Sequence, residues 1–308
     1  MVLRFLVTLL AVLSLLTLAP VVAQDAEKHV FVTALHKDGA PIDGLTVEHF
    51  AVREGGKDRQ VVRVEPLRIP MHVAVLVDTS AASGVTNETF RAAVIDFVER
   101  LAAFNHVAVY AFGDRAVPVV GFTQSVPDLR RGMSGMFAWS YLIDAIDLSL
   151  RDFEKIEANR PVIVAIAAET PEASGRSAGS VVKRLIDQST AFHAISLATA
   201  TGSGTASTSP RTIPESSQRL QGMIATGEGD RERNKALEQG TTKTGGGRQR
   251  LTSTMALAQA LGRLSRELSN SYNVTFARSG DSRIKDLQVG IMLEGITLRA
   301  TAAPFGTR

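Results

Sequence analysis

The sequence predicts an α/β protein with a doubly wound, mostly parallel sheet and a small antiparallel β unit built from both chain ends. Three observations support this class. Four continuous apolar runs, at 71–77, 107–112, 162–168 and 192–198, have the length of strands buried on both faces. Amphipathic stretches separate these runs, and such alternation of strand and helix is typical of a parallel sheet. Shorter β-rich segments lie near both chain ends.

The first residues carry the pattern of a secretory signal peptide. Arg4 precedes an apolar run over 5–18, and Ala23 is a small residue at the expected cleavage point. We interpret residues 1–23 as a signal peptide and expect an exported protein that is periplasmic, envelope-associated or extracellular. An uncleaved anchor stays open, because the run approaches the ~20 residues that span a bilayer. No later segment is apolar for long enough, so we expect no transmembrane segment after cleavage.

Residues 24–69 are predicted to form an amino-terminal β segment. Short β-rich runs alternate there with the turn signals KDG, DG and EGG, as in antiparallel strands. About 35 residues of strand do not close a hydrophobic core alone. We expect the segment to pack on a carboxy-terminal β segment at 279–308, which has strand-like runs at 283–293 and 296–302.

The central domain is predicted to occupy residues 70–278. A further helix is expected at about 254–271, and the Gly, Ser and Thr-rich stretch at about 200–244 is expected to be a mobile insertion. The other expected helices carry apolar residues at helical spacing, namely Phe90, Val94, Phe97, Val98 and Leu101, then Leu142, Ile146, Leu150 and Phe153, then Val181, Val182, Leu185 and Ile186.

The composition excludes several classes of function. Lys and Arg total 34 against 31 Asp and Glu, and the net charge of +3 is too small to indicate a nucleic-acid partner. Cysteine is absent, which excludes disulfides, thiolate zinc sites and cysteine nucleophiles. We expect no serine in a G-x-S-x-G elbow, and no G-x-G-x-x-G or phosphate-binding loop after a strand. A metal-assisted hydrolase is the less favoured alternative, because no nucleophile, base and orienting group are expected to converge at one loop.

The end of the first buried strand carries the most specific pattern. Val77 is followed by Asp78-Thr79-Ser80, and later come YAFGDRAVPVVGFT, a serine before YLIDAI and an apolar strand after RP. Together these resemble the von Willebrand factor A domain. With its flanking segments, the chain is similar to a bacterial exported family, common in acidobacteria, that carries such a domain. The resemblance implies a Rossmann-like fold and a non-enzymatic protein-binding or scaffold role.

The resemblance also implies a metal-ion-dependent adhesion site. In that site Mg²⁺ is held by oxygen ligands from three loops, and one position stays open for a partner's carboxylate. Asp78 and Ser80 match the first two ligand positions, and Ser140 takes the position of a threonine. Ala82 and Ala167 stand where the family has a serine and an aspartate.

The two missing oxygen ligands predict a degenerate metal site. Their loss corresponds to about 3–6 kcal/mol of binding free energy, so Mg²⁺ binding is expected to be weak or absent. Glu169 is the candidate substitute ligand, and a working Mg²⁺-dependent adhesion module is the alternative. Asp78 and Ser80 could instead cap backbone amides where the strand turns.

Two aromatic residues next to Ser140 are the predicted partner-binding residues. Phe137 and Trp139 fall in a loop expected at the carboxyl-end face of the sheet, where they would anchor a protein partner. They could equally cover a defunct metal site. We therefore predict an exported, non-enzymatic protein-binding module without a required cofactor, and a structural envelope component is a third possibility. The oligomeric state is not predicted.

Overall fold

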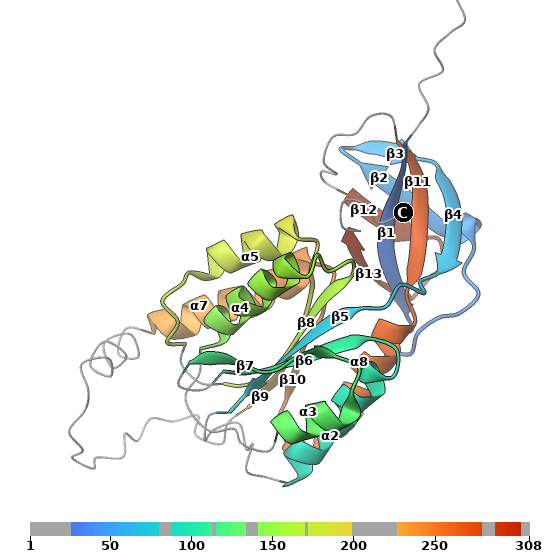
Figure 1. Ribbon diagram of the computed structural model, residues 1–308. Helices are drawn as coiled ribbons and strands as arrows, with labels where there is room; N and C mark the ends of the chain where they lie inside the picture. Colours follow the sequence, from blue (N-terminus) through green and yellow to red (C-terminus); the bar gives the residue numbers. More distant parts are fainter. Residues whose placement is uncertain are drawn as a thin grey trace, which may run out of the picture.

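The computed structural model of the chain describes residues 26–79, 88–112, 115–133, 141–169, 172–198, 227–278 and 287–302. The predicted signal peptide at 1–23 lies outside these ranges. The described residues form a large unit of sheet and helices and a small unit of strands, which lie side by side (Figure 1). Within the described residues, no helix is both long and apolar enough to cross a bilayer.

The large unit contains a six-stranded sheet. Its strands lie in the order β10-β9-β8-β5-β6-β7, and every neighbouring pair is parallel except β6 and β7. The predicted doubly wound, mostly parallel sheet is therefore confirmed. The strands are β5 (His72–Asp78), β6 (His106–Phe112), β7 (Ala116–Thr123), β8 (Pro161–Ala168), β9 (Ala191–Leu197) and β10 (Arg248–Leu251).

Helices cover both faces of this sheet (Figure 1). One face carries α2 (Glu88–Ala102), α3 (Val126–Gly132) and α8 (Leu257–Ser269), which follows the short 3-10 turn η3 (Thr254–Ala256). The other carries α4 (Leu142–Lys155), α5 (Ala178–Asp187) and α7 (Glu228–Lys243). Successive side chains of a strand point to opposite faces, so each central strand contributes to both cores. The predicted apolar faces are buried except at Ile186, which is 41% exposed.

The small unit consists of two antiparallel sheets around one core. One has the order β13-β1-β11-β4 and the other β12-β2-β3. Pairing of β1 with β13, and of β2 with β12, confirms that the unit is built from both chain ends. Its elements are β1 (Ala26–Leu35), the 3-10 turn η1 (Val47–His49), β2 (Phe50–Glu54), β3 (Lys57–Arg59), β4 (Val61–Pro66), β11 (Tyr272–Arg278), β12 (Leu287–Ile291) and β13 (Thr297–Ala302).

Two expectations from the sequence are wrong. β11 belongs to the small unit rather than to a domain that ends at residue 278, because it pairs with β1 and β4. Residues 228–243 are not a mobile insertion, because they form α7, which packs on α5 and β9. The buried face of α7 contains Ala236 and Gly240, small residues that allow close packing without a large apolar stripe. Residues 200–226 lie outside the described ranges.

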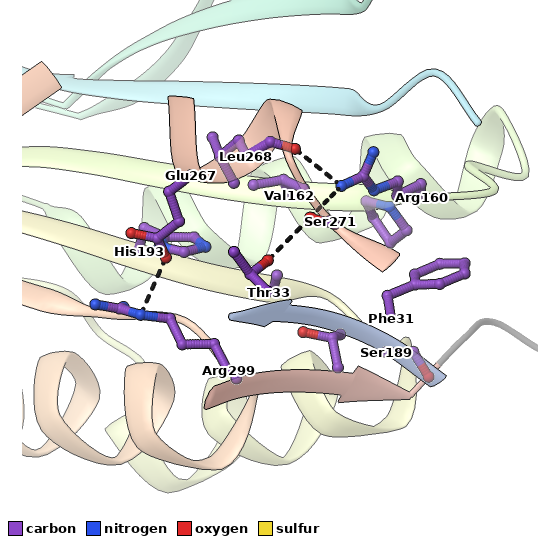
Figure 2. Close-up of a pocket in the computed structure, with 14 residues that line it drawn as sticks. Phe31, Thr33, Arg160, Val162, Ser189, His193, Glu267, Leu268, Ser271 and Arg299 are labelled. Carbon is purple, nitrogen blue, oxygen red and sulfur yellow. Dashed lines mark hydrogen bonds and ion pairs between the residues drawn. The ribbon is translucent and has the colours of Figure 1, made fainter. Parts of the chain in front are cut away.

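Arg160, directly before β8, links the two units. Its Nη2 donates hydrogen bonds to the Leu268 carbonyl oxygen and to the Ser271 hydroxyl, each at 3.0 Å. The Ser271 hydroxyl also lies 2.9 Å from the Thr33 hydroxyl of β1. A dashed line in Figure 2 marks this contact. Burial lowers the pKa of Arg160 to about 10, so the guanidinium is still charged at neutral pH. The end of α8 and the start of the small unit are therefore held by one buried cation.

Candidate functional site

The site predicted from the sequence lies where β5 and β8 end, which we call the carboxyl edge. The two strands are parallel neighbours, so their last residues, Asp78 and Ala168, meet at this edge. Asp78 is fully buried, and its Oδ2 accepts a hydrogen bond from the Ala168 N–H at 2.9 Å. The Asp78 carboxylate thus caps an amide of the neighbouring strand.

A buried arginine from α7 reaches the same place. Arg233 is 3% exposed, and its Nη2 donates a hydrogen bond to the Ala168 carbonyl oxygen. Asp78 and Arg233 therefore engage the N–H and the carbonyl of one residue. Burial lowers the pKa of Arg233, and the carboxylates of Glu172 and Asp78 oppose that change. The guanidinium is a fixed positive charge beside the Asp78 carboxylate.

Glu172 supplies a second buried carboxylate. It is 1% exposed, and its Oε1 accepts hydrogen bonds from the backbone N–H and the hydroxyl of Ser174. Its Oε2 lies 3.8 Å from Arg233 Nη1. Burial raises the pKa of Glu172, while Ser174 and Arg233 act in the opposite direction. We call Asp78, Glu172 and Arg233 the Arg233 cluster, in which one cation lies close to two carboxylates.

The position of Arg233 follows from the close packing of the first turn of α7 against the backbone of Glu172. Gly229 lies one helical turn before Arg233 on the same buried face of the helix. A Cβ at Gly229 would lie 2.5 Å from the Glu172 carbonyl oxygen, so only glycine allows this approach. The contact brings the first turn of α7 against the segment after β8 and carries the Arg233 side chain to the carboxyl edge.

Of the other residues considered for a metal site, the structure describes Ala167 and Glu169, and neither belongs to the Arg233 cluster. Ala167 is buried in the core of β8 and has no side-chain oxygen. Glu169 is ion-paired with Arg250, whose Nη2 lies 2.6 Å from Glu169 Oε2. Ser80, Phe137, Trp139 and Ser140 lie outside the described residues.

A cavity of about 360 Å³ lies beside the Arg233 cluster. Its wall carries charges of both signs and one apolar residue, from Glu169, Asp230, Arg233, Asn234, Leu237, Arg248 and Arg250. Three arginines and two carboxylates in one wall suit polar and charged groups of a binding partner more than an apolar ligand.

The expectation that no serine occurs in a G-x-S-x-G sequence is wrong, because Ser177 is the central residue of such a sequence at Gly175–Gly179. Its hydroxyl accepts a hydrogen bond from the Ser180 N–H at 3.3 Å and caps the amino terminus of α5. Across the ranges that the structure describes, this hydroxyl is hydrogen-bonded to no histidine, and no three His, Asp or Glu residues are grouped to hold a metal ion. This serine therefore acts as a helix cap.

Sequence reasoning also missed Arg233 and Glu172. The available signal was the spacing of Gly229, Arg233, Leu237 and Gly240, which share one face of a helix. That face is polar or small at most positions, so it does not resemble the apolar stripe by which buried helices are recognised.

Comparisons with known proteins give structural likeness only. No protein-family model matches the chain, and no curated protein matches it. Among solved structures, the conserved hypothetical protein BatB from Bacteroides thetaiotaomicron is 14% identical, with a TM-score of 0.45 over 65% of this chain and 100% of that one. A von Willebrand factor type A protein from Catenulispora acidiphila is 10% identical, with a TM-score of 0.45 over 93% and 76% of the two chains.

A third solved structure is proximal thread matrix protein 1 from the mussel byssus. It is 12% identical, with a TM-score of 0.49 over 70% of this chain and 50% of that one. The strand order and the helices on both faces, rather than these weak likenesses, define the fold of this chain.

Proposed function

We propose that this chain is a non-enzymatic protein-binding module that captures its partner at the carboxyl edge without a metal ion. The observation that carries the proposal is the buried Arg233 guanidinium beside Asp78. It supplies, from within the chain, a positive charge next to the carboxylate that the resemblance assigns to Mg²⁺.

The described residues fit a divalent cation poorly. Mg²⁺ requires a nearly octahedral shell of oxygen atoms. Here Asp78 Oδ2 already accepts the Ala168 N–H, Ala167 offers no side-chain oxygen, and the charge of Arg233 repels a second cation. Glu169, the candidate substitute ligand, is paired with Arg250. We therefore assign no step to a metal ion.

The partner surface that we propose combines the polar cavity beside the Arg233 cluster with Phe137 and Trp139. Aromatic anchors next to polar groups are typical of the residues that dominate protein interfaces.

The resemblance to the exported bacterial family, together with the signal-peptide pattern, supports a location outside the cytoplasm. Amino-terminal sequencing of protein from its native envelope fraction should give Gln24 as the first residue, and an intact Met1 would contradict export with cleavage.

Metal binding is tested by calorimetry with Mg²⁺ and Mn²⁺. We expect no binding to the parent chain. The variant Arg233→Met removes the internal cation and leaves the Asp78 and Glu172 carboxylates for a divalent ion, so either ion should bind it measurably and raise its thermal unfolding temperature above that of the ion-free variant. Micromolar binding of either ion by the parent would contradict the proposal and indicate a working metal-dependent adhesion module.

Partner binding is tested by capture from envelope extract on the immobilised mature chain, with EDTA and with Mg²⁺. The same proteins should be retained under both conditions. Trp139→Ala should weaken capture by about 2 kcal/mol if this residue is an anchor. Phe104→Ala is the matched control, because Phe104 is an exposed aromatic residue just before β6, at the opposite edge of the sheet. Loss of capture in EDTA would overturn the proposal.

A further inference from the structure

A second cavity, of about 290 Å³, lies where the small unit meets the large one, and we call it the junction cavity. Its wall comes from the turn after β1, from β9 and β10, from α8 and from β13. The residues that matter here are Lys37, His193, Arg263, Glu267 and Arg299. Junctions between structural units are common places for small-molecule sites.

The wall of the junction cavity carries an excess of positive charge. The cationic side chains Lys37, Arg263 and Arg299 line it together with only two carboxylates, Asp38 and Glu267. The Arg248 guanidinium instead donates a hydrogen bond to Asn234 Oδ1 of α7, at 3.1 Å, beside the other cavity. Glu267 Oε1 lies 3.0 Å from Arg299 Nε, and Asp38 Oδ1 accepts the Ala40 N–H at 3.0 Å in its own turn. Within the described part of the chain, Lys37 and Arg263 form no ion pair or side-chain hydrogen bond.

A buried imidazole with an unused nitrogen also lines this cavity. His193 is 4% exposed, and its Nδ1 has no hydrogen-bond partner among the described residues. The nearest carboxylate oxygen, Glu267 Oε1, is 3.8 Å away. Figure 2 draws a neighbouring pocket that shares His193, Glu267 and Arg299 with the junction cavity, and a dashed line there joins the Glu267 carboxylate to Arg299. Buried polar atoms without a partner are rare, and a bound polar group would satisfy this one.

Arg299 is held in position by a glycine on the opposite wall. A Cβ at Gly247 would lie 1.4 Å from Arg299 Nη1, so the guanidinium rests directly against the Gly247 backbone. The Arg299 side chain therefore crosses from β13 of the small unit to the start of β10 in the large unit. A cation placed this way contributes to a preformed site.

We propose that the junction cavity binds a small oxyanion, carried by a ligand with a phosphate or several carboxylate groups. Cationic side chains from three separate chain segments repel one another, and an anion among them relieves that repulsion. Guanidinium and ammonium groups are the donors that recognise phosphate and carboxylate oxygens. The volume suits a small ligand rather than a macromolecule. Because both units line the cavity, the bound ligand also stabilises their contact.

Calorimetric titration of the full chain with inorganic phosphate and, separately, with citrate tests this inference at constant ionic strength in chloride. We expect at least one probe to bind at a single site and to raise the thermal unfolding temperature. Binding of phosphate alone indicates a ligand with a phosphate group, and binding of citrate alone indicates a polycarboxylate. Binding of both probes indicates a site that recognises the oxyanion chemistry that they share. If neither phosphate nor citrate binds, the inference is overturned.

Two variants and one control separate a site from general surface charge. Lys37→Gln and Arg263→Gln should each weaken binding by about tenfold or more. Neither residue forms a polar contact within the described residues, so both variants should fold like the parent. Arg266→Gln is the matched control, because Arg266 is an exposed arginine of α8 outside the cavity wall, and it should change binding by less than about twofold.

Equal weakening by Arg266→Gln would contradict a specific site. Lys37 and Arg263 line the junction cavity and not the cavity beside the Arg233 cluster. Failure of this inference is therefore distinguishable from failure of the proposed partner binding, which is measured at the carboxyl edge.

Discussion

Replacing Arg233 by methionine removes the single positive charge of the Arg233 cluster. The methionine side chain is also long and unbranched, so much of the packing volume is kept. Asp78 and Glu172 would then be two buried carboxylates without their cation. Removal of one partner from a buried ion pair costs about 3–5 kcal/mol, because the remaining charge has lost its water and its counter-charge. The free energy of unfolding of an ordinary domain is about 5–15 kcal/mol, so Arg233→Met should be strongly destabilising.

The loss should depend on pH with a defined sign. Burial already raises the pKa of Glu172 in the folded chain, and loss of the opposing Arg233 charge raises it further above its value in the unfolded chain. A group whose pKa is raised on folding stabilises the fold below its unfolded-state pKa and loses that contribution as the pH rises through its folded-state pKa. The difference in free energy of unfolding between parent and Arg233→Met should therefore be largest at neutral pH and smaller in acid.

Urea denaturation followed by far-ultraviolet circular dichroism measures this difference. Arg231→Met is the control, because Arg231 is exposed on the same helix, and it should change the free energy of unfolding by less than about 0.5 kcal/mol. Adding Glu172→Gln to Arg233→Met should recover part of the loss, because one uncompensated charge is removed. A loss below about 1 kcal/mol, or one that does not change with pH, would refute the reasoning.

Three further predictions concern stability. Gly229→Ala places a Cβ 2.5 Å from the Glu172 carbonyl oxygen, and chemical denaturation should show a loss of about 1–3 kcal/mol. Arg160→Met removes the donor to the Leu268 carbonyl oxygen and to the Ser271 hydroxyl, and it should lower the free energy of unfolding by about 2 kcal/mol or more. An unchanged free energy of unfolding would argue against the link between the two units. Burial lowers the pKa of His193 from 6.5 to about 3, so the unfolded chain binds the extra proton between those values and stability falls as the pH drops through this range. Relative to His193→Phe, the parent should lose up to about 5 kcal/mol on acidification, and parallel pH profiles of the two proteins would contradict the buried neutral imidazole.

Much of the large unit could be predicted because its signals are local. The runs that became β5 and β8 are apolar at nearly every position, as strands buried on both faces must be. α4 and α8 each repeat apolar residues at helical spacing. Such patterns depend only on which side of an element meets the core.

The elements that escaped prediction depend on distant contacts. α7 buries Gly229, Ala236 and Gly240, and small residues do not raise the hydropathy of a sequence. The amino terminus of α4 has no side-chain cap at Tyr141. Instead, the hydroxyl of Ser174, in the segment between β8 and α5, accepts a hydrogen bond from the Asp144 N–H at 3.0 Å. Neither feature leaves an apolar periodic signal in its own segment.

The sequence by itself determined the class of fold, the central strands, most helices and the position of Asp78 at the end of a buried strand. Only the tertiary structure decided what Asp78 meets. The charge beside it comes from Arg233, which arrives through the packing of α7 against the segment after β8. Local periodicity reports which face of an element is buried, whereas the pairing of charges depends on distances between segments that lie far apart in the chain.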